Sequence, residues 1–92
     1  MTLESEPKTI GGRIYATRKA WGWSQKKLAT YVGVDQASVS LWERDKIYPS
    51  GSSFVALCAL FGLGRYTLTT GSEWVINETH ADIPVFKEVL PA

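Results

Sequence analysis

The chain has little of several residue types, and each shortage excludes a class of protein. A single cysteine, Cys58, cannot form an internal disulfide, and one cysteine with one histidine cannot supply a cysteine-rich metal site. No apolar run approaches the ~20 residues of a membrane-spanning helix. The N-terminus has neither the basic start nor the apolar core of a secretory signal. These shortages favour a reducing, intracellular compartment, in which Cys58 is expected to be a buried small hydrophobe.

The sequence also lacks the residue sets that catalysis requires. No nucleophile with a neighbouring base, no pair of carboxylates in a plausible pocket and no metal cluster can be assembled from it. Gly11 and Gly12 are not a phosphate-binding loop, because no strand precedes them and no Lys-Ser or Lys-Thr pair follows. His80 stands alone in a polar stretch, which indicates a surface residue. We therefore expect neither an enzyme nor a bound cofactor or metal ion.

The net charge of +1 conceals an uneven distribution along the chain. Residues 1–71 contain nine lysines and arginines against five acids, a balance of +4. Residues 72–92 contain one lysine against four acids, a balance of −3. A mildly basic body with an acidic tail permits a polyanionic partner but does not require one.

The 92 residues are enough for one small domain with its core. Apolar positions recur at helical spacing from Ile10, and no alternating strand pattern occurs before residue 72. Residues 10–71 are predicted to form the domain, and residues 1–9 a loose arm. Residues 72–92 contain two short apolar runs that favour strands, with Pro84 against a regular central strand. We predict a linker followed by an extended tail.

The first helix is predicted to run from Ile10 until Gly22 ends it. Ile10, Ile14 and Trp21 fall on one helical face, whereas the basic residues, Arg13 among them, fall mostly elsewhere. The first helix should therefore be packed inward through its apolar residues.

A fourth helix is predicted in the stretch SFVALCALF, with Ser52 or Ser53 as its N-cap. It is apolar nearly all round, as a buried central helix would be. The stretch that follows gives a short fifth helix at best, which Gly71 closes.

The stretch between these helices, residues 25–44, has the pattern of a helix-turn-helix. Ser24 is a good N-cap for one short helix, and Asp35 caps the next, which runs from about Gln36 to Arg44. Gly33 supplies the positive φ of the turn, and Ala29 is small enough for a close helix crossing. The inward positions of the pair have the required apolar type: Leu28, Val32, Val34, Val39 and Trp42.

Residues 10–71 resemble the phage lambda repressor and Cro superfamily, also called the xenobiotic-response-element family. The matching stretches are IGGRIYATRKAWGWSQKKLA, VGVDQASVSLWERDKIYP and LTTG. The resemblance implies an all-α, compact domain of four to five helices. It also implies a sequence-specific transcriptional regulator, a phage or prophage repressor in the bacterial cytoplasm, associated with the nucleoid when bound. Such a protein binds a pseudo-palindromic operator in double-stranded DNA as a homodimer, here through the loop after Phe61 and residues 64–70.

In this family the second helix of the motif enters the major groove by its N-terminal end. Gln36 has the donor and acceptor for bidentate recognition of adenine, and Ala37 is short enough to touch a thymine methyl group. Ser40 and Leu41 lie one turn further on the same side. Leu41 departs from the family, which more often has a polar residue there, so it either reads a thymine methyl group or packs on a neighbour.

Phosphate contacts are expected from a second set of residues. By resemblance Gln25 donates to a phosphate and braces Gln36, and the helix N-terminus favours the anion. The full set of expected phosphate contacts is Gln25, Lys26, Lys27, Ser38 and Lys46. For each lysine the alternative is an ordinary solvated charge.

Other residues at matching positions are expected to be structural. The family pairs an arginine of the first helix with the glutamate of the WER stretch, partly buried, which assigns Arg18 and Glu43 to each other. Trp42 is expected in the core, beside the small Ala29 and the turn at Gly33.

The tail leaves a second function open. The stretch DIPVFKEVLPA weakly resembles the start of the self-cleaving C-terminal domain of lambda-type repressors. The tail is therefore either the start of a missing C-terminal domain or a segment with its own role, such as dimerisation. It also favours an antitoxin-like protein-binding module, in which the same fold binds a protein partner through the tail.

Overall fold

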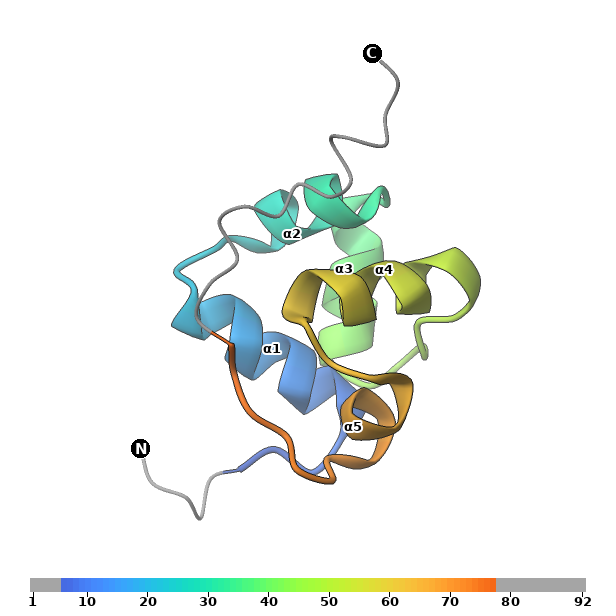
Figure 1. Ribbon diagram of the computed structural model, residues 1–92. Helices are drawn as coiled ribbons and strands as arrows, with labels where there is room; N and C mark the ends of the chain where they lie inside the picture. Colours follow the sequence, from blue (N-terminus) through green and yellow to red (C-terminus); the bar gives the residue numbers. More distant parts are fainter. Residues whose placement is uncertain (1–5, 78–92) are drawn as a thin grey trace.

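The computed structural model describes residues 6–77, which form five α-helices and no strand. The helices are α1 (Ile10–Ala20), α2 (Gln25–Val32), α3 (Gln36–Glu43), α4 (Gly51–Phe61) and α5 (Arg65–Thr70). Figure 1 shows α2 at the opposite end of α1 from α5, with α3 and α4 between them. The expected all-α fold of four to five helices is confirmed.

Local signals in the sequence set the helix ends. Thr9 is the N-cap of α1, and its side chain accepts a hydrogen bond from the backbone N–H of Gly12. At the other end Trp21 is the C-cap, and Gly22 follows with φ of +75°. Ser24 caps α2 as predicted by accepting from the N–H of Lys27. Four residues thus separate α1 from α2 and turn the chain sharply.

The core lies where α1, α3, α4 and α5 meet, with α2 closing one side. Burial of such side chains contributes on the order of 1.5–3 kcal/mol each relative to exposure. The least exposed apolar residues are Ile14, Leu28, Val39, Leu57, Phe61 and Leu68. Cys58 is half-buried against this cluster, and its burial raises the pKa of its thiol. It lies beside the core rather than fully within it.

The start and the surroundings of α4 differ from the prediction. Its N-cap is Ser50, not Ser52 or Ser53, and the helix begins at Gly51. No side-chain hydrogen bond caps this end, so cap chemistry gave no strong signal for the boundary. The helix is not buried all round either, because Val55 is 56% exposed. Apolar composition therefore overstated how much of the surface of α4 the other helices cover.

The chain does not leave the domain after α5. Figure 1 shows residues 71–77 running back along α1 toward the start of α2. At the end of this segment the carbonyl oxygen of Asn77 accepts from Nε1 of Trp21 at 2.7 Å. The Asn77 amide nitrogen donates to the carbonyl oxygens of Phe61 at 2.7 Å and Gly62 at 3.2 Å. Asn77 therefore joins the ends of α1 and α4.

The two predicted terminal segments lie mostly outside the described residues. Of the arm, residues 6–9 precede α1 without regular structure, and Pro7 and Thr9 both contact the domain. Of the tail, residues 72–77 contain no strand. His80 and the apolar run at residues 83–90 lie outside the described range, as does the remainder of the proposed protein-binding tail.

Candidate nucleic-acid interface

The turn between α2 and α3 has the geometry of a helix-turn-helix. Gly33 adopts φ of +89°, and its N–H donates to the carbonyl oxygen of Ala29 at 2.8 Å. The N–H of Val34 donates to the same oxygen at 3.0 Å. A Cβ on Gly33 would meet no atom within 4 Å, so glycine is needed here for its backbone conformation and not for space. Ala29 is 2% exposed, as a close approach between the helices requires.

The N-terminal end of α3 is exposed to solvent. Asp35 caps it, with its carboxylate accepting from the N–H of Ser38 at 3.2 Å. Gln36 and Ala37, the first two residues of the helix, are both exposed. Ser40 and Leu41, one turn further on, are half-buried. This end therefore presents the amide of Gln36 and the methyl group of Ala37 to solvent.

The C-terminal end of α3 is fixed to α1 by a buried ion pair. Nε of Arg18 lies 2.6 Å from Oε2 of Glu43, and Nη2 donates to Oε1 at 2.8 Å. The side chains are 8% and 4% exposed. Nη1 of Arg18 also donates to the carbonyl oxygen of Trp23 at 2.8 Å. The hydrogen bonds to Glu43 raise the pKa of Arg18 despite its burial. Two parallel bonds fix the orientation of the helices as well as their distance.

The buried pair is connected to the exposed end of α3 through α2. Nε2 of Gln25 donates to Oε1 of Glu43 at 3.0 Å, which leaves the Gln25 oxygen free to accept. That oxygen accepts from Nε2 of Gln36 at 3.4 Å. A hydrogen-bonded row thus runs from Arg18 to the amide of Gln36. The row sets which way the Gln25 amide faces, because an ionised carboxylate can only accept, so the amide must turn its NH2 group toward Glu43.

The expected phosphate-binding residues are brought together only in part. Lys26 and Lys27 lie in the first turn of α2, where backbone N–H groups also favour an anion, and Lys46 follows α3. All three lysines are exposed. Nζ of Lys27 lies 4.8 Å from the ring centre of Trp23, within cation–π range. The Ser38 hydroxyl instead donates to Asp35 at 3.1 Å, so it is engaged within its own helix cap.

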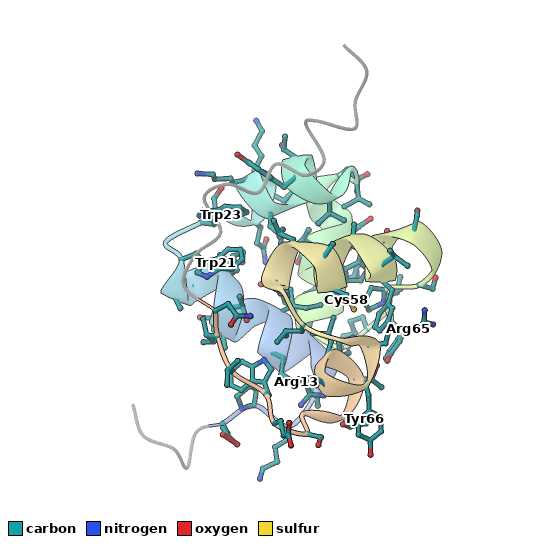
Figure 2. All side chains as sticks on the ribbon, viewed as in Figure 1. Arg13, Trp21, Trp23, Cys58, Arg65 and Tyr66 are labelled. Carbon is teal, nitrogen blue, oxygen red and sulfur yellow. The ribbon has the colours of Figure 1, made fainter. Side chains whose placement is uncertain are left out.

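Sequence reasoning missed two residues that hold the N-terminal half of α1 against the rest of the domain. Asp45 lies in the loop after α3 and accepts hydrogen bonds from Thr9 and Gly11. Arg13 is 2% exposed and bonds to the end of α5; in Figure 2 it lies between α1 and α5. The only sequence signal for Asp45 is that it is an acid between the two basic residues of the stretch ERDKI.

Two findings concern other kinds of site. Within residues 6–77, no three side chains among His, Cys, Asp and Glu gather as metal ligands would. In the same range no helix combines the length and apolarity that crossing a membrane demands.

Comparison with known proteins agrees with this geometry. The model of the helix-turn-helix family matches residues 14–68, from the middle of α1 into α5. The chain belongs to the lambda repressor and Cro-like helix-turn-helix family. The family model spans all of α2, α3 and α4, which make up the motif and the helix behind it.

Relatives of this family include a transcriptional regulator and solved repressor structures. The chain is 32% identical over 71 residues to the HTH-type transcriptional regulator DicA of Escherichia coli K12, a match that covers 77% of this chain and 53% of DicA. The chain thus spans about half the length of this curated relative. The P22 c2 repressor, solved in complex with a synthetic operator, is 32% identical with a TM-score of 0.67, covering 71% of this chain and 98% of the repressor chain. The restriction-modification controller protein C.AhdI of Aeromonas hydrophila is 29% identical with a TM-score of 0.57, covering 64% of this chain and 89% of its own.

Proposed function

We propose that the protein is a sequence-specific transcriptional regulator, a repressor, that binds double-stranded DNA with α3 in the major groove. A major groove about 12 Å wide admits one α-helix. The P22 c2 repressor, which shares this fold, was solved on a synthetic operator, and that likeness supports the same partner here.

The observation that carries the proposal is the contrast between the two ends of α3. Its C-terminal end is held by the buried pair of Arg18 and Glu43, whereas Gln36 and Ala37 at its N-terminal end are exposed. Gln36 is also braced by Gln25. An exposed amide on a rigid helix loses little conformational freedom when it binds an adenine edge through two hydrogen bonds. Ala37 would then meet a thymine methyl group, with Ser40 and Leu41 further along the groove.

Phosphate contacts would hold α3 in this groove. Lys26 and Lys27 in the first turn of α2 and Lys46 after α3 are all exposed. Gln25 would donate to a phosphate from the N-terminus of α2. Ser38 is the weakest candidate, because its hydroxyl already donates to Asp35. Each phosphate contact adds about 0.9 to the slope of log K against log salt.

A homodimer on a two-fold operator completes the proposal. One domain covers one half-site, and two-fold use needs half-sites roughly 34 Å apart. Residues 64–70 are proposed as the contact between copies. Arg65 and Thr69 line a hollow of about 460 Å³ together with Tyr48, Phe54 and Val55. Tyr48 and Val55 are about half exposed, so this face offers apolar surface for a second copy.

The test compares two variants that look alike in a gel shift. Gln36→Ala should abolish the preference for one base pair in each half-site, costing about 1–3 kcal/mol there. Its melting temperature should not change, because exposed substitutions usually alter stability by less than ~0.5 kcal/mol. Trp42→Ala, at a position 4% exposed, should remove all binding by unfolding the domain, since truncating a buried Trp costs about 3–5 kcal/mol.

Selection of bound duplexes from a random library, followed by thermal melts of both variants, provides the measurements. Retention of the full base preference by Gln36→Ala would contradict the placement of α3 in the groove.

A further inference from the structure

We propose that Asp45 is a positioning residue for DNA binding. Its carboxylate holds the loop after α3 against the N-terminus of α1 and so fixes where Lys46 meets the DNA backbone. This inference rests on the proposed function, because it concerns the phosphate contact assigned to Lys46.

The Asp45 carboxylate is bound by two donors at the start of α1. The Thr9 hydroxyl donates to Oδ2 at 2.8 Å, and the Gly11 N–H donates to Oδ1 at 3.1 Å. Thr9 is also the N-cap of α1 and accepts from the N–H of Gly12 at 3.0 Å. Because the N-terminus of a helix carries a partial positive charge, an anion is stabilised there. Asp45 therefore acts as a second cap, supplied from residue 45 to a helix that begins at residue 10.

The backbone at Asp45 is also fixed by hydrogen bonds. Asp45 has φ of +57°, a conformation that only one other non-glycine residue within 6–77 adopts, namely Glu73. The N–H of Asp45 donates to the carbonyl oxygen of Trp42 at 2.9 Å, and the N–H of Lys46 donates to Leu41 at 2.9 Å. Aspartate tolerates positive φ better than most residues do. The left-handed residue turns the chain back over the end of α3 and determines the direction in which residue 46 leaves it.

Gly11 makes this joint possible. A Cβ at Gly11 would lie 2.2 Å from the carbonyl oxygen of Trp42 and 2.5 Å from Oδ1 of Asp45. Both distances are far below van der Waals contact, so any side chain at position 11 would push the end of α3 away from α1. Gly11, which is not part of a phosphate-binding loop, is required because α1 approaches the end of α3 and the loop after it so closely.

The charges around the joint favour a role in binding over a purely structural one. Asp45 lies between two exposed cations, Arg44 and Lys46. Within residues 6–77 neither cation forms an ion pair, because the carboxylate is turned to Thr9 and Gly11. Both cations therefore remain available to phosphate.

The experiment compares Asp45→Gly with a matched control. Glycine adopts the positive φ without strain and removes the side chain with its carboxylate. Glu73→Gly makes the same change of charge at φ of +58°, at an exposed residue far along the chain from α3. Affinity for a duplex selected from a random library is measured over a salt series. We expect Asp45→Gly to bind roughly three- to tenfold more weakly, with a salt slope lower by about one, the loss of a single phosphate contact. Glu73→Gly should bind at least as tightly as the parent, with an unchanged slope.

A double-mutant cycle with Lys46→Ala tests whether Asp45 acts through that lysine. In the Lys46→Ala background, Asp45→Gly should cause no further loss, whereas independent effects would add. Asp45→Asn, which tolerates positive φ and keeps an acceptor for Gly11, should restore most of the affinity and the slope. Additive losses, or a slope unchanged in Asp45→Gly, would overturn the inference.

Two controls keep the result interpretable. If Asp45→Gly melts below the assay temperature, the same cycle is measured at a lower temperature at which thermal melts show this variant to be folded, with the same expectations. Absence of binding by the parent protein would refute the proposed function. Binding by the parent together with normal binding by Asp45→Gly would refute only the role of Asp45.

Discussion

The two halves of α1 each bury an arginine, and they do so by different means. In the C-terminal half, Arg18 is 7% exposed and bound to the carboxylate of Glu43. In the N-terminal half, Arg13 is 2% exposed and bound only to backbone carbonyl oxygens. Nε and Nη2 donate to Leu68 and Thr69 at 2.8 and 2.6 Å, and Nη1 to Pro7 at 3.3 Å.

The two environments have opposite effects on the guanidinium groups. Burial lowers the pKa of Arg13, with smaller opposing effects from Tyr48 and Asp45. The bonds to Glu43 raise the pKa of Arg18. Arg13 is stabilised by the C-terminal carbonyl groups of α5, which carry partial negative charge and have no partner within the helix. A full countercharge is thus unnecessary where a helix end supplies several oriented acceptors.

Glu43→Ala should have the largest effect, because it leaves Arg18 as an unpaired buried charge. The expected loss is about 3–5 kcal/mol in the free energy of unfolding, which is a large share of the total for a domain of this size. Replacing both partners, as Arg18→Met with Glu43→Leu, should recover most of the loss. Urea unfolding of the single and double variants measures this, and equal losses in both would contradict the pairing argument.

Arg13→Met should cost less, about 1–3 kcal/mol, because it leaves carbonyl oxygens without a donor but no charge unpaired. Lys19→Met, at an exposed position of the same helix, serves as the control and should change stability by less than ~0.5 kcal/mol. The same urea titration applies. A loss as large as that of Glu43→Ala would show that the two arginines are equivalent after all.

Gly71→Ala tests the space around Arg13. Gly71 has φ of +86°, and a Cβ there would lie 2.7 Å from Nη1 of Arg13. Positive φ alone costs alanine about 1–2 kcal/mol. Gly22→Ala has the same backbone penalty at φ of +75° with no atom within 4 Å. Gly71→Ala should therefore lower the melting temperature more than Gly22→Ala does. This difference measures the clash with the guanidinium, and it should disappear in an Arg13→Met background.

Gln25→Ala should affect stability least, by about 0.5–1.5 kcal/mol for one hydrogen bond to Glu43. Its effect on DNA binding should nevertheless exceed that of Arg13→Met. The hydrogen bonds of Glu43 extend through Gln25 to Gln36, whereas those of Arg13 do not reach Gln36. Base preference measured on folded protein at low temperature checks this. Loss of preference in Arg13→Met with none in Gln25→Ala would reverse the argument.

These two regions also mark what could be predicted from the sequence. Gly33, Asp35 and Ser24 have local signals, since a turn with positive φ or an N-cap selects the residue type, and their helix ends were correct. The pairing of Arg18 with Glu43 followed from a resemblance. Arg13 was predicted to lie mostly off the inner face, and that was wrong, because its partners are backbone atoms of residues 68 and 69, which leave no mark in the sequence.

The candidate site shows the same limit. Exposure of Gln36 was expected from the family resemblance, which puts the start of the second helix of the motif in the groove. The bonds of Asp45 to Thr9 and Gly11 join residues more than 30 positions apart and have no such signal. The start of α4 was misplaced because Ser50, Ser52 and Ser53 are equally good caps by type. Tertiary packing chose among them.

The contacts of Asn77 bear on how shortened versions of this protein should be designed. Seven residues beyond the last helix, Asn77 donates to a carbonyl group at the end of α4 and accepts from the indole N–H of Trp21. A fragment cut at Gly71, where helices suggest a natural stop, would expose all of these groups to water. The indole of Trp21, 5.0 Å from that of Trp23 between ring centres, would then emit from a wetter environment. Because the cut also removes Trp74, the comparison is with the full chain carrying Trp74→Phe. A red-shifted tryptophan fluorescence spectrum of the fragment would show that water reaches Trp21 even where the helix content is unchanged.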